Sequence, residues 1–147
     1  MKDLIQDVNF AEKVRNSFAQ QKFMETLGAT LAKVAPGSVE IRLPYQPRLT
    51  QQHQFLHAGV VAAVLDTACG YAAFTLMPPQ AEVLTIEYKI DLLAPARGGE
   101  LLARAQVLKP GKTIVVCTGE AMMRQGDGQK VVAHMTGTMM AITGRKL

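Results

Sequence analysis

Asp66 is the residue whose type and surroundings are best suited to chemistry. It lies in the run HAGVVAAVLDTACGYAAFTLM, from His57 to Met77, and is the only formally charged side chain between Arg48 and Glu82. An ionised carboxylate among apolar side chains is costly unless it has partners or a task, because burial favours its neutral form. A single carboxylate can serve as a nucleophile or as a general base. The pattern also fits a buried Asp whose oxygens are satisfied by local hydroxyl or backbone groups.

The run that carries Asp66 is expected to form a helix at the centre of the protein. Ala, Leu and Met dominate it, and Pro78-Pro79 should end it. A helix that is apolar on all sides is a buried helix. Small residues would let a sheet wrap closely round one side of it, namely Ala62, Ala63, Ala68, Gly70, Ala72 and Ala73. The other side must be covered too, most simply by a second copy of the chain, so a homodimer is predicted.

The segment before this helix should contribute another helix and a strand hairpin. Residues 9–27 have the pattern of a helix, with a capping box from Asn9 to Glu12 and a second cap at Ser17 that could divide it. Strands are predicted over residues 29–35 and 39–45, on either side of a Pro-Gly turn. A polar, irregular stretch then leads into the central helix.

Four strands are predicted after the double proline. Two sets of side chains alternate over residues 85–92, so they are expected on opposite faces: Ile86, Tyr88, Ile90 and Leu92 on one, and Thr85, Glu87, Lys89 and Asp91 on the other. Further strands are predicted over residues 100–109, 113–124 and 130–143. Their connections are short and rich in turn formers, so consecutive strands should pair antiparallel. The result is an α+β domain spanning residues 1–147, with the helix covering one face of the sheet.

Composition narrows the class of protein. The chain has 147 residues, 48% of them hydrophobic and 19% charged, which is typical of one ordinary globular domain. Its net charge of +4 is scattered without long basic runs, so no nucleic-acid partner is expected. The N-terminus lacks the apolar core of a signal peptide, and Asp66 interrupts the one apolar run of membrane-spanning length, so a cytoplasmic location and no membrane partner are predicted. Cys69 and Cys117 give neither a disulfide framework nor a metal-ligand spacing, and no metal is expected.

The stretch H-A-G-V-V-A-A-V-L-D-T-A-C-G, from His57 to Gly70, resembles the signature of the PaaI-like hotdog acyl-CoA thioesterases. In that family H-G-G is followed by an Asp on the same central helix. The resemblance extends to the strand order and to the turn from Lys109 to Thr113, and it departs at Ala58, where the first glycine is usual. It implies a hotdog fold, in which an antiparallel sheet of about five or six strands wraps around a long central helix. It also implies hydrolysis of acyl-CoA thioesters, with coenzyme A entering only as part of the substrate and no other cofactor.

Thioester hydrolysis needs a base or nucleophile and donors for the developing oxyanion. Asp66 could attack the carbonyl or activate a water, and the sequence does not choose between these routes. The donors would be the backbone N–H groups of Ala58 and Gly59 at the free N-terminus of the helix, where the unpaired amides and the helix dipole favour negative charge. Because His57 and Asp66 are nine residues apart, they are separated by roughly 13 Å along the helix axis. The site is therefore predicted to be shared between antiparallel helices of two subunits, in agreement with the family, which also suggests a tetramer of two dimers.

The resemblance implies supporting residues near the reacting centre. Relatives carry an Asn where this chain has Gln51, and a hydroxyl where it has Thr85. His57 is expected to tighten the helix entry or to hydrogen-bond near the thioester, and is not expected to act as the base. No role is assigned to His53 or His134.

Contacts to coenzyme A and to the acyl group are also predicted. The phosphates are expected to meet basic side chains and turn amides, drawn from Arg97, Gly111, Lys112 and Thr113, with Arg145 or Lys146 as further candidates. Gln52, beside Gln51, is also predicted to contact the substrate. A Gly-Lys turn between strands is equally an ordinary hairpin turn. The acyl pocket should be apolar, drawn from residues such as Phe55, Leu56, Val60 and Leu65.

Two other functions fit the same residues. A hotdog hydratase or dehydratase would use His57 together with Asp66 across the dimer. A non-catalytic module would bind acyl-CoA tightly without turnover. Release of free thiol from acyl-CoA separates hydrolysis from both.

Overall fold

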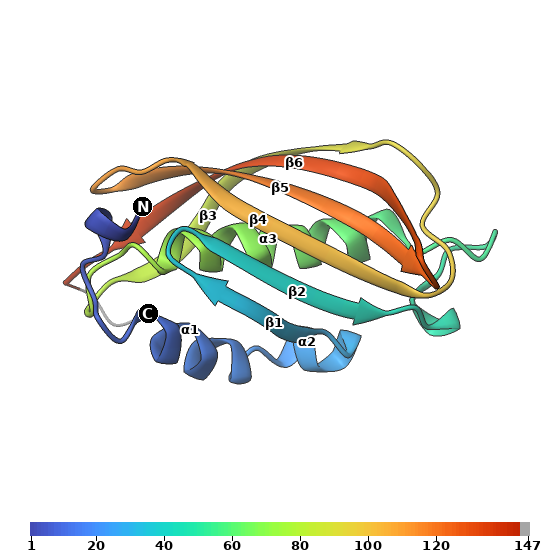
Figure 1. Ribbon diagram of the computed structural model, residues 1–147, viewed down its shortest axis with the longest axis horizontal. Helices are drawn as coiled ribbons and strands as arrows, with labels where there is room; N and C mark the ends of the chain where they lie inside the picture. The colour runs from blue at the N-terminus through green and yellow to red at the C-terminus, as the bar shows by residue number, and fades with distance from the viewer. Residues whose placement is uncertain (145–147) are drawn as a thin grey trace.

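A six-stranded antiparallel sheet curls around one long helix in the computed structural model (Figure 1). The structure describes residues 1–144. The helices are η1 (Lys2–Leu4), α1 (Phe10–Ala19), α2 (Lys22–Leu27), η2 (Pro47–Leu49) and α3 (Ala58–Phe74), and the strands are β1 (Thr30–Ala35), β2 (Ser38–Pro44), β3 (Glu82–Leu92), β4 (Glu100–Lys109), β5 (Ile114–Gln125) and β6 (Gly128–Ile142). These elements confirm the predicted central helix, which ends at Phe74, and every predicted strand to within three residues at each end. Within the described residues, no helix is long and apolar enough to cross a membrane.

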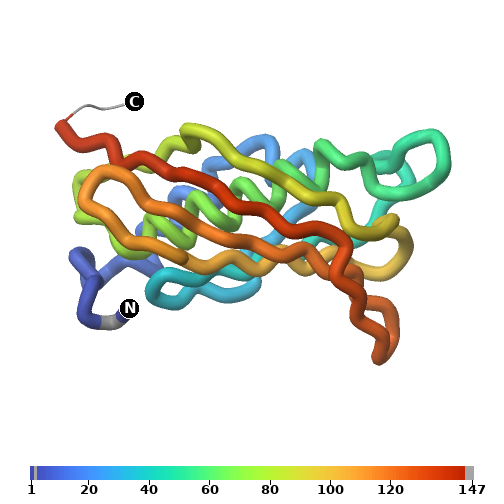
Figure 2. The backbone as a smooth tube through the Cα atoms, turned by 90° about the horizontal axis from the view of Figure 1, so that it is seen from above, coloured from blue at the N-terminus to red at the C-terminus, as the bar shows by residue number. Residues whose placement is uncertain are grey.

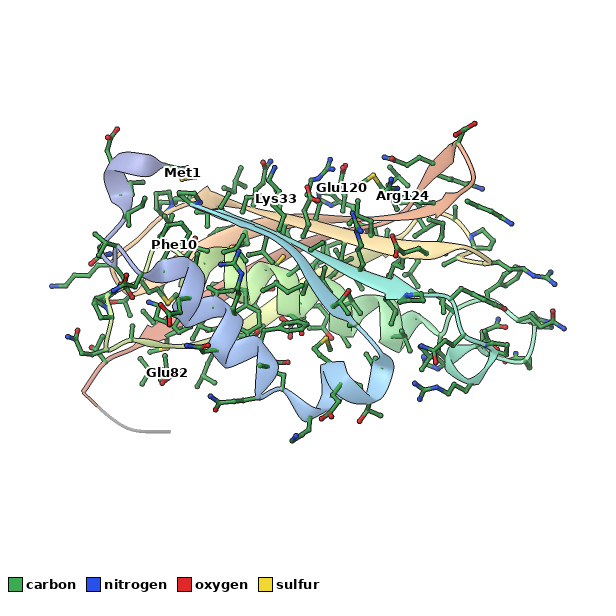
Figure 3. The ribbon with its side chains drawn as sticks, turned by 60° about the horizontal axis from the view of Figure 1, so that its bottom comes forward. Met1, Phe10, Lys33, Glu82, Glu120 and Arg124 are labelled. Atoms are coloured by element: carbon green, nitrogen blue, oxygen red, sulfur yellow. The ribbon has the colours of Figure 1, made fainter. Side chains whose placement is uncertain are left out.

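The core lies between α3 and the concave face of the sheet. Alternate side chains of β4 and β5, such as Leu101, Ala103 and Cys117, are fully buried against the helix, whereas Glu120 and Arg124 point outward (Figure 3). The approach is closest at Gly119, where an added Cβ would lie 3.1 Å from Cδ2 of Leu65. Small residues on both elements therefore allow the sheet to wrap tightly, as the composition of the helix predicts.

The predicted N-terminal helix over residues 9–27 is two helices, α1 and α2, that run beside β1 (Figure 1). Ser17 does not cap a second helix, because its hydroxyl lies 3.1 Å from the hydroxyl of Tyr71 on α3. The helix begins directly after Asn9, as predicted, but the Asn9 side chain makes no capping hydrogen bond. At Ser17, a contact with α3, which is distant in the sequence, thus takes the place of the expected local cap.

The strand order is β1-β2-β4-β5-β6-β3, so the prediction that all consecutive strands pair is wrong for β3 and β4. β3 pairs with β6 along one edge of the sheet, as Figure 2 shows, and β4 lies between β2 and β5. The segment 93–99 makes the crossing at the end of the sheet. Leu93 N–H donates to Val132 O at 2.8 Å, and Ala96 O accepts from Leu56 N–H at 2.8 Å. These bonds tie the segment to β6 and to the entry of α3, which satisfies its backbone without a hairpin.

Thr75, just after α3, provides a test of how the helix is fixed to the sheet. Its buried hydroxyl accepts from Gly37 N–H in the β1–β2 turn at 2.7 Å and donates to Ala72 O at 2.7 Å. Thr75→Val keeps the shape but leaves the Gly37 N–H without a partner, so the free energy of unfolding should fall by about 1–3 kcal/mol. Urea unfolding at fixed protein concentration measures this. Thr75→Ser retains both bonds and should lose only about 1 kcal/mol for the methyl group; a Val variant as stable as the wild type would contradict the role.

Candidate active site

One face of α3 is left uncovered by the sheet. Gly59, Ala63, Asp66 and Gly70 follow the helical spacing of four and three residues, so they form a single stripe. They are half-buried or exposed, whereas the opposite face of α3, with Val64, Leu65 and Ala68, is fully buried. The only charged residue of α3 therefore lies on the side of the helix that the chain does not cover.

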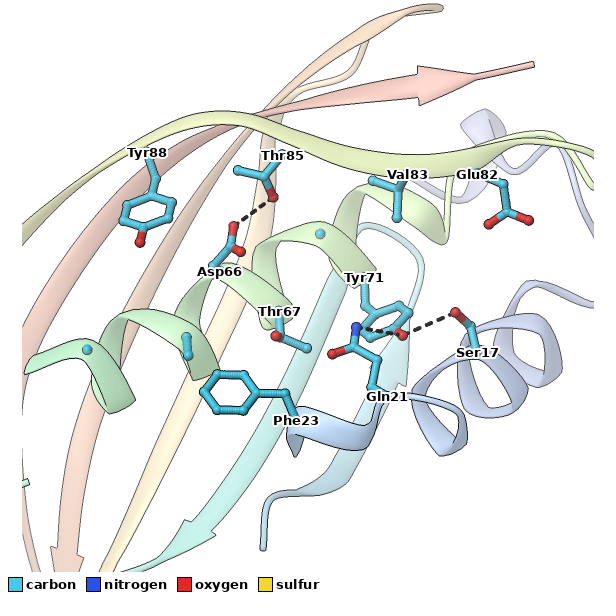
Figure 4. Close-up of a pocket in the computed structure, with 13 residues that line it drawn as sticks. Ser17, Gln21, Phe23, Asp66, Thr67, Tyr71, Glu82, Val83, Thr85 and Tyr88 are labelled. Carbon is cyan, nitrogen blue, oxygen red and sulfur yellow. Dashed lines mark hydrogen bonds between the residues drawn. The ribbon is translucent and has the colours of Figure 1, made fainter. Parts of the chain in front are cut away.

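Asp66 lines a cavity of about 410 Å³ between α3 and β3. Its Oδ1 accepts a hydrogen bond from Thr85 Oγ1 at 2.8 Å (Figure 4). Partial burial raises the pKa of the Asp66 carboxyl above its usual value, and the Thr85 hydrogen bond opposes this by stabilising the charged form. The site thus combines a carboxylate of increased basicity with a hydroxyl that fixes one of its oxygens.

A β-bulge positions Thr85. Thr85 pairs with Met139 and Glu87 with Thr138, so Ile86 is an extra residue in β3. Strict alternation predicted Thr85 on the face opposite Tyr88. The bulge shifts the alternation of side chains along β3, so Thr85 and Tyr88 both line the Asp66 cavity. The prediction that they lie on opposite faces is therefore wrong.

The far wall of this cavity comes from the two N-terminal helices. Tyr71 OH accepts from Gln21 Nε2 at 3.0 Å and lies within hydrogen-bond distance of Ser17, and Phe23 lines the opening (Figure 4). Sequence reasoning did not identify Ser17, Gln21 or Phe23 as site residues. No local pattern could have identified Ser17 and Gln21, because their partner Tyr71 is about fifty residues away along the chain.

His57 caps the N-terminus of α3. Its Nδ1 accepts from Gly59 N–H at 2.9 Å, which agrees with the expected role of tightening the helix entry. This bond also occupies one of the two amides that the sequence analysis grouped as oxyanion donors. The N–H of Ala58, as the first residue of the helix, has no intrahelical acceptor.

A second cavity, of about 380 Å³, lies beside this helix end. Gln51 and Ala58 line it together with apolar residues, namely Phe55, Leu56, Val61, Leu92, Leu93, Ala94, Pro95, Ala96 and Val132. Two of the predicted acyl-pocket residues are therefore here, whereas Val60 packs partly buried against the core and Leu65 is fully buried beneath the sheet. Within one chain, two different cavities are thus lined by these predicted residues: one by Asp66 and Thr85, the other by Gln51 and Ala58.

The predicted phosphate contacts lie at opposite ends of α3. Arg97, in the segment between β3 and β4, donates from Nη2 to Gln54 Oε1 at 2.7 Å near the N-terminal end. Gly111 and Lys112 line a third cavity, of about 380 Å³, with Leu76 and Met77 beyond the C-terminal end. The two basic residues are therefore not brought together within one subunit.

The remaining predicted residues are dispersed. Thr113 O accepts from Ala141 N–H at 2.8 Å, and Gln52 is exposed. His134 Nε2 lies 2.9 Å from Thr118 Oγ1, away from the Asp66 cavity. Arg145 and Lys146 lie outside the described residues. Among the residues that the structure describes, no group of three or more His, Cys, Asp or Glu side chains could hold a metal ion.

Comparison with known proteins gives consistent matches. Residues 53–132 match the family described as the thioesterase superfamily. The crystal structure of a thioesterase family protein from Silicibacter pomeroyi is 51% identical, with a TM-score of 0.90 over 92% of this chain and 99% of that one. A putative esterase of Halobacterium salinarum is 35% identical over 61% of this chain and 62% of its own length. The medium/long-chain acyl-CoA thioesterase YigI of Escherichia coli K12 is 25% identical over 80% of this chain and 84% of its own length. These matches confirm the predicted hotdog fold.

The raised pKa of Asp66 predicts that its charge destabilises the fold. The native state holds the proton more tightly than the unfolded state, so stability falls as pH rises from the usual value of 3.8 through the raised value. Asp66→Asn keeps an oxygen that can accept from Thr85 and removes the charge. Its melting temperature should exceed that of the wild type at neutral pH, and the gap should narrow as the pH is lowered towards about 4. The control is Asp91→Asn, on the same edge strand as Thr85, which removes an exposed carboxylate paired with Lys89 and should not raise the melting temperature. An Asp66→Asn protein less stable than the wild type at neutral pH would contradict the prediction.

Proposed function

The chain belongs to the thioesterase superfamily and is a thioester hydrolase, and from this we propose that it hydrolyses acyl-CoA thioesters to the free acid and coenzyme A with Asp66 as nucleophile or general base. The proposal for the substrate rests on the acyl-CoA thioesterase among its relatives. No metal and no further cofactor takes part in the proposed reaction.

The environment of Asp66 is the observation that carries the assignment. Burial makes this carboxylate more basic, and a general base is most effective when its pKa approaches the working pH. The Thr85 hydroxyl fixes Oδ1, which leaves Oδ2 to reach the carbonyl carbon or a water. Either route forms a tetrahedral oxyanion and expels the coenzyme A thiolate; direct attack leaves an Asp66–acyl anhydride, which water then hydrolyses to the free acid and the Asp66 carboxylate.

The oxyanion would be bound by the Ala58 N–H of a neighbouring subunit. In one chain the rigid helix holds the N-terminal amides and Asp66 roughly 12–13 Å apart along its axis. A two-fold pairing with antiparallel α3 helices would bring the Gln51–Ala58 cavity of one subunit to the Asp66 cavity of the other. Gln51 and Thr85 would then support the same reacting centre, and His57 would hold the helix entry.

Two features support this pairing. Gly70 lies on the uncovered stripe of α3, where an added Cβ would meet no atom within 4 Å in its own chain, so no contact in its own chain requires a glycine there. β3 is an edge strand with exposed apolar side chains, including Ile86, Tyr88 and Leu92. A partner subunit would cover both the stripe and the edge.

The rest of the substrate would extend away from Asp66. In the antiparallel pair the N-terminal end of one α3 lies beside the C-terminal end of the other. Lys112 with the amides of Gly111 and Thr113 would then be available to the coenzyme A phosphates, with Gln52 near the opposite end. We further propose a cytoplasmic protein that assembles as a tetramer of two such dimers.

Replacement of Asp66 tests the catalytic assignment. Asp66→Asn should lower kcat for acyl-CoA hydrolysis by about 10²–10⁴-fold, since removing a general base has effects of this size. Thiol release measured over a panel of aromatic, medium-chain and long-chain acyl-CoAs gives the rate and the acyl preference together. Asp91→Asn should hydrolyse at the wild-type rate. An Asp66→Asn protein that folds and retains wild-type kcat would remove Asp66 from the mechanism. Turnover in oxygen-18 water then tests the route: label in the Asp66 carboxylate would show direct attack, because it can enter only when water attacks the aspartyl carbon of an Asp66–acyl anhydride.

Mixed dimers test whether the site is shared. Ala58→Pro removes the proposed donor N–H, and proline is well tolerated at the first position of a helix. Purified heterodimers of one Asp66→Asn subunit and one Ala58→Pro subunit should keep about half of the wild-type activity, because one of their two sites has both groups intact. If each subunit held a complete site, both sites would be damaged and the heterodimer would be inactive. Ala58→Gly, which retains the N–H, serves as the matched control and should stay active in the homodimer.

A further inference from the structure

The loop before α3 contains a residue in an unfavourable backbone conformation. Gln54 has a φ of +66°, and it is the one residue other than glycine with a positive φ among those described. It lies at the tip of a small hairpin in which Thr50 bridges to Leu56 and Gln51 N–H donates to Phe55 O at 2.9 Å. A left-handed conformation is unfavourable for residues with a Cβ, and where it persists the surroundings hold it in place.

Two contacts from distant segments hold Gln54. Tyr45 OH donates to Gln54 O at 2.7 Å, and Arg97 Nη2 donates to Gln54 Oε1 at 2.7 Å. A glycine would adopt the same φ without strain but would have no side chain for Arg97 to hold. The Gln side chain at this position therefore connects the hairpin to the segment that crosses from β3 to β4.

This hairpin carries the groups that face the second cavity. Gln51 Oε1 accepts from His53 N–H within the hairpin, which orients its carboxamide and leaves Nε2 as a donor. Directly after the hairpin, His57 N–H donates to Leu49 O at 2.9 Å, and Ala58 begins α3. Gln51 and Ala58 line the same cavity from either side of Gln54. Gln54 therefore lies in the short segment that connects the two.

We infer that Gln54 and Arg97 form a clamp that positions the Gln51 amide and the Ala58 N–H for the transition state. Arg97 is then a positioning residue, in place of the phosphate contact expected from the sequence. This inference rests on the proposed thioester hydrolysis. It fits the location of Arg97, which reaches the hairpin at the N-terminal end of α3 while Lys112 lies beyond the other end.

Kinetics with two substrates separate the two roles of Arg97. Arg97→Met keeps the apolar stem and removes the donors. Its activity would be measured on an acyl-CoA and on the S-acyl-pantetheine thioester of the same acid, which has no phosphates. For both substrates kcat should fall by about tenfold or more with KM nearly unchanged, because the clamp acts on groups used in the transition state. A rise in KM for the acyl-CoA alone would show a phosphate contact and overturn the clamp. Arg124→Met removes an exposed arginine at the same end of the sheet and should leave both substrates unaffected.

Variants of Gln54 test whether its side chain or only its backbone matters. Gln54→Gly adopts the same φ and loses the bond to Arg97, so it should fold well and lower kcat as much as Arg97→Met does. The double variant should be no slower than either single variant, because both remove one interaction. A Gln54→Gly protein with wild-type kcat, or additive losses in the double variant, would overturn the clamp.

Amide hydrogen exchange gives a measure that does not depend on turnover. Exchange of the hydrogen-bonded amides of Gln54, Leu56 and His57 should be faster in Arg97→Met and Gln54→Gly than in the wild type, and unchanged in Arg124→Met. Unchanged protection in the two clamp variants would overturn the inference even if activity fell. A wild-type protein that released no thiol would instead overturn the proposed hydrolysis, whatever the exchange pattern.

Discussion

The structure depends on the need to cover α3, a helix that is apolar on nearly every side. The curled sheet covers one side, and it can do so closely because small residues meet where the elements cross, as at Gly119 against Leu65. One sheet cannot enclose a helix completely, so a stripe containing Gly59, Asp66 and Gly70 remains uncovered. The same incomplete coverage creates the cavity in which we propose that the substrate reacts, and it leaves the surface that a partner would cover in the proposed dimer.

The chemistry of the site follows from where Asp66 lies on that stripe. Deeper in the core its carboxyl would remain neutral, and in open solvent it would be an ordinary weak base. At the boundary, burial raises its pKa while Thr85 limits the rise. The Thr85 hydroxyl reaches Asp66 only because the extra residue Ile86 shifts the alternation of β3. A local irregularity in an edge strand thus places the hydroxyl that limits the rise in the pKa of Asp66.

Properties that arise from local pattern could be predicted from the sequence, and those that depend on distant contacts could not. The limits of β4 and the existence of α3 follow from alternation, turn residues and composition. β3 lies at the edge beyond β6, and the side-chain alternation of β3 shifts at Ile86. Both features depend on which strands pair, and the periodicity of the sequence does not encode that pairing. Other contacts likewise join residues more than forty positions apart: Ser17 and Gln21 bond to Tyr71, and Arg97 bonds to Gln54. Asp66 stands out as the only charge in an apolar helix, whereas Thr85 and Gln51 are predicted from the family resemblance, which carries information about distant contacts that a single local pattern lacks.

The rigidity of α3 explains why the two halves of the proposed site need two chains. A helix holds Asp66 and its own N-terminal amides at a fixed axial separation of roughly 12–13 Å, which no side-chain motion closes. Two-fold symmetry turns this fixed spacing into two equal sites without any additional residue, provided that the helices run antiparallel. Precision then depends on how firmly each helix end is held. His57 fixes the first turn from within, while Tyr45 and Arg97 hold Gln54 of the preceding hairpin from outside. The unfavourable φ of Gln54 can persist because these external contacts hold a segment whose position, in the proposed dimer, determines the geometry of the neighbouring subunit's Asp66 site.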